Sequence, residues 1–185
     1  PPLPTLTTDD SDGDGIDDLT AGFADENGDG IPDYLDAVTA LNVLQEVRLR
    51  AASHLIEAEP GVTLRLGQLA LWAGRDAAQV NNADLAGFYG AGSADTVSNI
   101  GGYFDFELLD LSEPGQSVRV VIPQHAPVPA DAVYRKRVPT GWQSFYEDAR
   151  NALESAPGED GYCPPPGDAA YQPGLTEGHW CVQLT

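Results

Sequence analysis

Apolar and polar residues alternate in short runs over most of the chain. The clearest runs place an apolar side chain at every second position, at 47–51, 62–66, 104–108 and 118–122. Leu69 and Leu71 extend the pattern after Gln68, and shorter candidates occur at 133–134, 142–146 and 180–184. Alternation with a period of two is typical of strands that bury one face. About eight short strands separated by Gly and Pro predict an antiparallel β-sandwich, mainly β, over residues 37–185.

The segments between these runs are less regular. Leu35, Val38, Leu41 and Leu44 recur at helical spacing, which fits either a short helix or a lead-in to the next strand. Residues 73–102 and 151–178 are rich in small residues or proline and are expected to form long excursions. Residues 1–8 are expected to form an extended linker stiffened by proline.

Residues 9–36 contain an internal repeat instead of an alternating pattern. The motif D-x-[DN]-x-D-G-I-x-D begins at Asp10 and again at Asp25, 15 positions later. The second copy continues to Asp36 at its twelfth position, where the first copy has Ala21. A purely solvated acidic tract would not require isoleucine at the same position of both copies. Ile16 and Ile31 are therefore expected to pack beneath two folded loops.

The spacing of the repeat suits a bound cation. Oxygens at positions one, three and five converge when the chain wraps around an ion, glycine at position six permits the turn, and the carbonyl at position seven points inward. Hard oxygen donors favour Ca²⁺, whereas Zn²⁺ prefers Cys or His and Mg²⁺ retains water. The predicted calcium ligands are Asp10, Asp12, Asp14, Ile16, Asp18, Asp25, Asn27, Asp29, Ile31, Asp33 and Asp36.

The charge balance agrees with bound cations. The chain has 29 acidic and 9 basic residues, for a formal net charge of −20. This balance excludes general nucleic-acid binding, which needs a basic footprint, and disfavours docking on anionic lipid. Residues 1–36 contain no Lys or Arg, so their carboxylates repel one another unless a cation offsets them. The alternative is a highly solvated acidic surface.

The repeat resembles thrombospondin type 3 repeats, which wrap chain around calcium with little other core. It differs from an EF-hand because position twelve lacks glutamate and no clear helices flank the loops. The resemblance implies that neighbouring ions share carboxylates, so Asp25 is expected to complete the first loop in place of Ala21.

The downstream chain resembles the choice-of-anchor U domain of bacterial exported proteins. The likeness covers roughly three quarters of the chain and rests on EAEPGVTLRLG at 57–67, GYFDFE at 102–107, GQSVRVVIP at 115–123, AVYRK at 132–136, GW at 141–142, CPPPG at 163–167 and HWCVQLT at 179–185. This family commonly follows thrombospondin type 3-like loops and precedes C-terminal sorting signals. The resemblance implies a cell-surface or secreted protein of a Gram-negative bacterium. It leaves open whether a segment beyond Thr185 completes the domain.

The two cysteines fit an exported protein. Cys163 lies in a Pro/Gly loop and Cys181 in a candidate strand, so we expect a disulfide, with free buried thiols as the alternative. No C-x-x-C motif suggests a redox-active pair. The absence of methionine indicates an internal or processed fragment, and no apolar run approaches the roughly 20 residues of a membrane span.

Catalytic motifs are missing from the sequence. His54, His125 and His179 are scattered and are expected to be surface or turn residues, and no G-x-S-x-G motif singles out a nucleophile. We therefore predict a non-enzymatic structural or adhesive module, whose partners are neighbouring domains of the same polypeptide and a surface glycan or protein.

Two other functions remain open. One is a calcium-dependent glycan- or peptide-binding domain that uses the 73–102 excursion, with Asp84, Phe88, Tyr89 and Asp95 as its candidate contacts. The other is the accessory region of a secreted hydrolase whose catalytic domain lies elsewhere.

Overall fold

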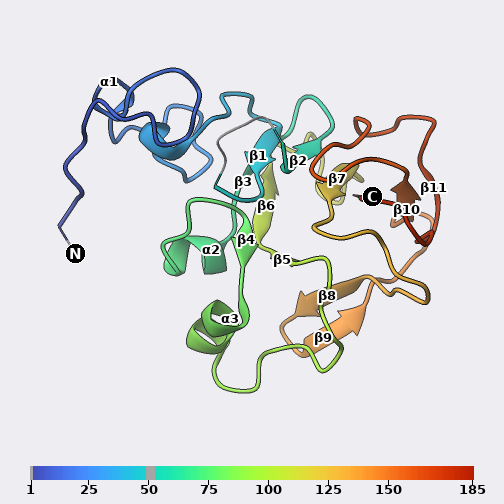
Figure 1. Ribbon diagram of the computed structural model, residues 1–185. Helices are drawn as coiled ribbons and strands as arrows, with labels where there is room; N and C mark the ends of the chain where they lie inside the picture. Colours follow the sequence, from blue (N-terminus) through green and yellow to red (C-terminus); the bar gives the residue numbers. More distant parts are fainter. Residues whose placement is uncertain (1, 49–52) are drawn as a thin grey trace.

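A computed structural model describes residues 2–48 and 53–185 of the chain (Figure 1). The protein is mainly β and antiparallel, as the alternation predicts. Its largest sheet has six strands in the order β1-β2-β7-β12-β10-β11. The strands are β1 (Val43–Gln45), β2 (Leu55–Ala58), β7 (Val120–Pro123), β12 (Cys181–Leu184), β10 (Leu153–Ala156) and β11 (Gln172–Pro173).

Three two-stranded ladders accompany this sheet. They pair β3 (Thr63–Leu66) with β6 (Phe106–Leu109), β4 (Gln79–Val80) with β5 (Tyr103–Phe104), and β8 (Arg135–Val138) with β9 (Gly141–Ser144). The main core joins the six-stranded sheet to the β3–β6 ladder, which gives a sandwich-like arrangement. Its fully buried side chains include Leu44, Ile56, Leu64, Leu66 and Ile122.

The described helical elements are short. They are α1 (Asp18–Ala21), a 3₁₀ turn η1 (Asp33–Leu35), α2 (Gln68–Trp72) and α3 (Asn82–Tyr89). The apolar stripe from Leu35 to Leu44 is therefore a lead-in to β1 and not a helix. The excursion at 73–102 contains α3 and β4, and the one at 151–178 contains β10 and β11.

Leu69 and Leu71 lie in α2, so their prediction as strand residues was wrong. The Asp105 carboxylate accepts a hydrogen bond from the Ala70 backbone N–H at 2.9 Å, near the first turn of this helix. Gly67 permits that approach, because a Cβ at this position would collide with the same carboxylate. A contact with a residue far along the chain thus favours the helix over a continuation of β3.

Most of the remaining strand predictions agree with strands of the structure. The alternating runs at 62–66, 104–108, 118–122, 142–146 and 180–184 overlap β3, β6, β7, β9 and β12. The short run at 133–134 lies just before β8. Of the run at 47–51, Leu49, Arg50 and Ala51 lie outside the described residues. None of the helices in the described part of the chain is long and apolar enough to cross a membrane.

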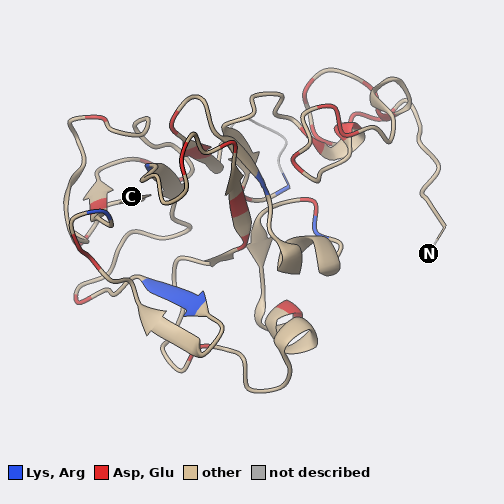
Figure 2. Ribbon diagram, turned by 180° about the vertical axis from the view of Figure 1, so that it is seen from behind, with Lys and Arg blue, Asp and Glu red and all other residues tan. Residues whose placement is uncertain are grey.

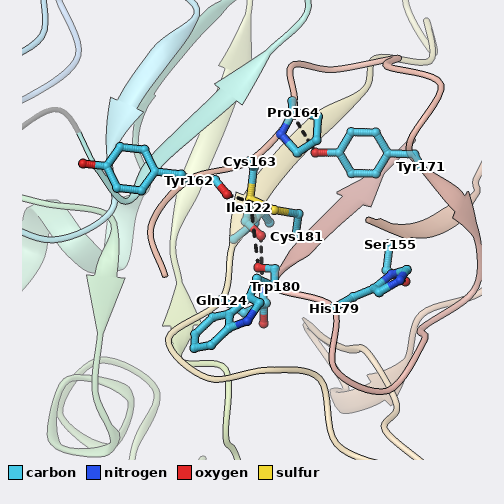
Figure 3. Close-up of a disulfide and its surroundings, with 10 residues drawn as sticks. All are labelled: Ile122, Gln124, Ser155, Tyr162, Cys163, Pro164, Tyr171, His179, Trp180 and Cys181. Atoms are coloured by element: carbon cyan, nitrogen blue, oxygen red, sulfur yellow. Dashed lines mark hydrogen bonds between the residues drawn. A yellow bond between two sulfur atoms is a disulfide. The ribbon is translucent and has the colours of Figure 1, made fainter. Parts of the chain in front are cut away.

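Both faces of the six-stranded sheet are covered around β7. Val120 and Ile122 belong to the main core, whereas Val121, on the opposite face, packs with Ala156, Tyr171 and Cys181. The second cluster lies beneath the loop that carries Cys163 (Figure 3).

The predicted disulfide is present between Cys163 and Cys181, whose Cα atoms are 5.5 Å apart. It ties the proline-rich loop to β12 (Figure 3), and the Tyr171 hydroxyl donates a hydrogen bond to the Pro164 carbonyl at 2.7 Å. A structural disulfide indicates a compartment outside the reducing cytoplasm.

Candidate metal centre

The first acidic loop is organised by its own carboxylates. Asp10 accepts backbone hydrogen bonds from Gly13 at 2.7 Å and Gly15 at 3.1 Å, and the Asp14 N–H donates to Asp12 at 3.1 Å. Asp10, Asp12 and Asp14 each offer an oxygen, and these oxygens lie within 4.8 Å of one another. In the described part of the chain this is the one group of three such residues found, and it could hold a metal ion.

The second loop repeats these bonds position by position. Asp25 accepts from Gly28 at 2.8 Å and from Gly30 at 3.0 Å, and the Asp29 N–H donates to Asn27 Oδ1 at 3.0 Å. The Ile31 N–H donates to Asp29 at 2.8 Å, as the Ile16 N–H does to Asp14 in the first loop at 2.6 Å. The sequence repeat is thus also a structural repeat.

The ninth residue of each copy closes its loop. Asp18 accepts a hydrogen bond from the Ser11 N–H at 2.8 Å, and Asp33 accepts one from the Glu26 N–H at 3.0 Å. Both carboxylates therefore bond the second residue of their own copy. Asp33 uses one oxygen for this, whereas Asp18 uses both, because its Oδ2 also accepts a hydrogen bond from the Ser11 hydroxyl at 2.8 Å.

Four carboxylates of the repeat are buried. Asp12, Asp18, Asp29 and Asp36 are 2%, 7%, 1% and 7% exposed, and Asp29 Oδ2 has no hydrogen-bond partner in the described structure. Burial and the charge of Asp36 raise the pKa of Asp29 to about 7. Burial raises the pKa of Asp36 to about 6, and the charge of Asp12 adds to the effect. Carboxylates in such surroundings favour either a proton or a cation.

Asp36 links the two loops. It stands at the twelfth position of the second copy, but Asp12 of the first copy is among the charges that act on it. Asn27 Nδ2 donates to Asp36 Oδ2 at 2.8 Å and to the Val38 carbonyl at 2.9 Å, which fixes Asp36 against the second loop. The contribution of Asp25 to the first loop, in place of Ala21, stays a prediction.

The two isoleucines of the repeat have different surroundings. Ile31 is fully buried in the main core, whereas Ile16 is 49% exposed, so the expectation that both pack beneath the loops was wrong for Ile16. The second loop adjoins the sandwich, because the Leu66 N–H of β3 donates to the Asp29 carbonyl at 2.7 Å. The Gly30 backbone has φ +94° there, and a Cβ would lie 2.9 Å from Leu71 Cδ2.

Acidic residues are concentrated on these N-terminal loops, as Figure 2 shows. The first loop extends away from the sheets, and the second lies between it and the sandwich (Figure 1). Between the two copies, the Asp33 N–H donates to the Ala24 carbonyl at 2.7 Å and the Tyr34 N–H donates to the Gly22 carbonyl at 3.2 Å. The Phe23 and Tyr34 rings also meet edge to face, so the two loops form one connected unit.

Two of the histidines come together in the fold, which the sequence did not reveal. The His54 and His125 rings stack with centroids 5.0 Å apart, and His125 Nε2 lies 3.4 Å from Oε2 of the fully buried Glu46. On the other side, His54 Nε2 lies 3.0 Å from the exposed Asp160 carboxylate. The expectation that the histidines are scattered was wrong for this pair, although both lie in bends outside the strands and are partly exposed.

The buried pair of Glu46 and His125 makes stability depend on pH. Burial raises the pKa of Glu46, and the contact with Glu46 raises the pKa of His125 above its ordinary 6.5. Both groups bind protons more tightly in the folded chain, so the free energy of unfolding should fall as pH rises through the neutral range. In the variant Glu46→Gln, the free energy of unfolding should fall by less over the same range. Urea unfolding between about pH 5.5 and about pH 8.5 measures this difference.

The exposed Glu113 supplies a control for this experiment, because Glu113→Gln removes one carboxylate away from the histidines. Its pH dependence should match that of the unaltered protein. Equal slopes for all three proteins would contradict the assignment to Glu46 and His125.

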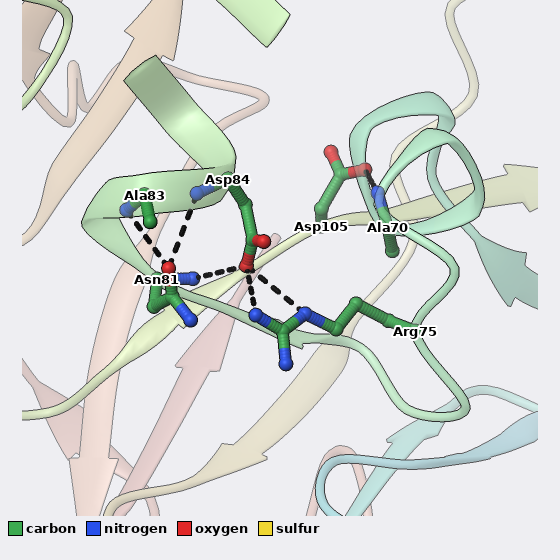
Figure 4. A network of polar contacts seen from close by, with 6 residues as sticks. All are labelled: Ala70, Arg75, Asn81, Ala83, Asp84 and Asp105. Atoms are coloured by element: carbon green, nitrogen blue, oxygen red, sulfur yellow. Dashed lines mark hydrogen bonds and ion pairs between the residues drawn. The ribbon is translucent and has the colours of Figure 1, made fainter. Parts of the chain in front are cut away.

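The candidate ligand contacts of the 73–102 excursion are largely structural. Asp84 accepts hydrogen bonds from Arg75 at 2.6 and 3.0 Å and from the Asn81 N–H at 2.8 Å, which completes a capping box at the start of α3 (Figure 4). Asp95 pairs with Arg135 at 2.8 Å. Phe88 contacts Tyr89 edge to face.

His179 has a structural role as well. Its Nδ1 lies 3.0 Å from the hydroxyl of Ser155 (Figure 3), but this buried hydroxyl also bonds the Gly174 carbonyl and the Thr176 N–H. The hydroxyl therefore bridges neighbouring backbone segments and is not free to act as a nucleophile.

Comparisons with known proteins leave the site to be interpreted from its geometry. No family model matches the chain, and no match was found among curated proteins or solved structures.

Proposed function

We propose that residues 9–36 bind calcium and that the bound ions order the junction between the upstream chain and the sandwich. The observation that carries this proposal is the buried Asp29, whose Oδ2 has no partner, within a loop that repeats the bonds of its neighbour. A cation at this place would offset the cost of burying a carboxylate.

The donor set favours calcium over other metals. The first loop offers Asp10, Asp12 and Asp14, and the second offers Asp25, Asn27 and Asp29, all through oxygen. Backbone carbonyls of Ile16 and Ile31, and the carboxylates of Asp18, Asp33 and Asp36, complete the proposed sets. Ca²⁺ accepts six to eight oxygen ligands at flexible angles, which suits such loops.

The location of the second loop supports a structural role. Its Ile31 belongs to the sandwich core, and its backbone bonds β3. Calcium would therefore rigidify the connection between an exposed loop and a folded domain. We place the module outside the cell, on the surface of or secreted from a Gram-negative bacterium, because of the disulfide and the resemblance of the chain to exported proteins.

The role we propose is structural or adhesive and not enzymatic. Its partners are then the neighbouring domains of the same polypeptide, together with a surface glycan or protein. The alternatives are a calcium-dependent glycan- or peptide-binding domain and an accessory region of a secreted hydrolase. Glycan and peptide arrays probed with calcium and with chelator separate these: binding that requires calcium favours the binding domain, and blank arrays favour the structural module.

Calorimetric titration of the chelator-treated protein tests the calcium proposal. We expect saturable Ca²⁺ binding by the unaltered chain and its loss in the double variant Asp12→Ala plus Asp29→Ala, because each loop then lacks a buried ligand. Calcium at about 100 times its dissociation constant should raise the free energy of unfolding by about 2.7 kcal/mol.

Asp9 provides the matched control, since Asp9→Ala removes one charge from the same acidic segment but outside both copies of the repeat. Its calcium binding should be close to that of the unaltered protein. An isotherm without binding, or one that the double variant leaves unchanged, would overturn the proposal.

A further inference from the structure

A cleft of about 970 Å³ lies on the side of the six-stranded sheet that faces the β8–β9 hairpin. Side chains from β7 and β12 line one side, and the hairpin and the segment at 97–106 line the other. Figure 1 shows the hairpin set apart from the sheet. The cleft is rich in aromatic side chains, which include Tyr103, Phe104, Phe106, Tyr134, Trp142 and Phe145.

Exposed apolar side chains also line the cleft. Val97, Ile100 and Val133 line it and are each about half exposed, at 45%, 53% and 56%. Ligand sites for small molecules have volumes of about 300 to 1,000 Å³ and are mostly apolar with a few placed polar groups. The cleft has the size and the lining of such a site.

The charge of the cleft differs from that of the rest of the protein. Its lining holds four basic residues, Arg135, Lys136, Arg137 and Arg150, and three acidic ones, Asp95, Asp105 and Asp131. The whole chain has 9 basic and 29 acidic residues. Figure 2 shows the basic strand β8 apart from the acidic N-terminal loops.

The described basic residues outside the cleft are neutralised by acids. They are Arg48, Arg65, Arg75 and Arg119, and each forms an ion pair with a carboxylate. Within the cleft lining, Arg135 pairs with Asp95. The described Lys and Arg residues without such a pair are Lys136, Arg137 and Arg150, and all three line the cleft.

The Arg137 guanidinium packs on an aromatic ring and has no ion pair with a carboxylate among the described residues. Its guanidinium carbon lies 3.3 Å from the centroid of the Tyr89 ring, and its Nε is buried with no hydrogen-bond partner in the described structure. A buried donor without a partner costs free energy, which an acceptor from a ligand would offset.

We propose that this cleft binds a small amphipathic carboxylate, whose hydrocarbon body packs against the aromatic wall and whose acid group meets the unpaired bases. The apolar wall disfavours a sugar, which would need many polar partners, and the cations complement an anion. The inference does not rest on the calcium loops, because no residue of 9–36 lines the cleft.

Titration with octanoate tests this inference, with octanol and octylammonium as ligands of matched length but different charge. Trp142, which lines the cleft, contributes to a tryptophan fluorescence signal, and calorimetry gives the affinity. We expect saturable binding of octanoate, binding of octanol at least about tenfold weaker, and still weaker binding of octylammonium.

Substitution of the bases gives a second measurement. Lys136→Gln plus Arg150→Gln should weaken octanoate about tenfold or more while octanol binds as before, because the carboxylate then loses two of its three proposed partners and the hydroxyl of octanol carries no charge. Both side chains are exposed, so the variant should fold. Arg119→Gln is the control: Arg119 pairs with Glu59 outside the cleft, and its loss should leave octanoate binding unchanged.

No saturable octanoate binding, equal affinity for all three ligands, or an octanoate affinity unchanged in the double variant would each overturn the inference. Calcium titration of the same proteins keeps the two proposals apart, because calcium binding should not respond to substitutions in the cleft.

Discussion

Ile31→Ala should lower the free energy of unfolding by about 2–5 kcal/mol, although Ile31 lies within the acidic repeat. Its side chain is fully buried in the main core, so its truncation leaves a cavity beside β3. Urea unfolding with saturating calcium measures the effect, and the midpoint of thermal unfolding should fall by about 2–4 °C for each kcal/mol lost.

The repeat supplies its own control for this result. Ile16 stands at the same position of the first copy but is half exposed, so Ile16→Ala should cost about 0.5 kcal/mol or less. If the two variants lost similar free energies of unfolding, the result would contradict the finding that only the isoleucine of the second loop belongs to the core of the sandwich.

Removal of the disulfide should have the next largest effect. Cys163→Ala plus Cys181→Ala should lower the free energy of unfolding by about 3 kcal/mol, because the bridge closes a loop between residues 18 positions apart. The variant also loses contacts around the fully buried Cys181, which packs with Val121 and Tyr171. Urea unfolding of the variant and of the unaltered protein gives the difference.

Reduction of the unaltered protein separates the two causes. If the constraint on the unfolded chain dominates, the reduced protein and the alanine variant should be destabilised alike. A reduced protein as stable as the oxidised one would show that the bridge does not stabilise this fold.

The strands that could be predicted from the sequence are those with large alternating side chains. Leu64 and Leu66 of β3 and Ile122 of β7 produce an unmistakable period of two. Strand β10 was missed because Ser155 and Ala156 are small, although both are completely buried. Their burial depends on the neighbouring strands and the disulfide-linked loop, which no local pattern records.

The loops of the candidate metal centre were predictable at the level of the motif. The spacing from Asp10 and from Asp25 anticipated two loops whose bonds correspond position by position. The different burial of Ile16 and Ile31 could not be anticipated, because the same motif meets solvent in one copy and β3 in the other. The contact of His125 with Glu46 likewise joins segments far apart in the sequence.

The attachment of the second loop also determines how tension would travel through the protein. A pull on the N-terminus would load the first loop, whose Ile16 has no anchor in the core, before it reached Ile31 and the hydrogen bond from Leu66 to Asp29. That hydrogen bond would transfer the force to β3, in the interior of the sandwich. The first loop would then extend while the second loop stayed attached to the sandwich. Under a moderate pull, the segment would therefore lengthen only in its first loop.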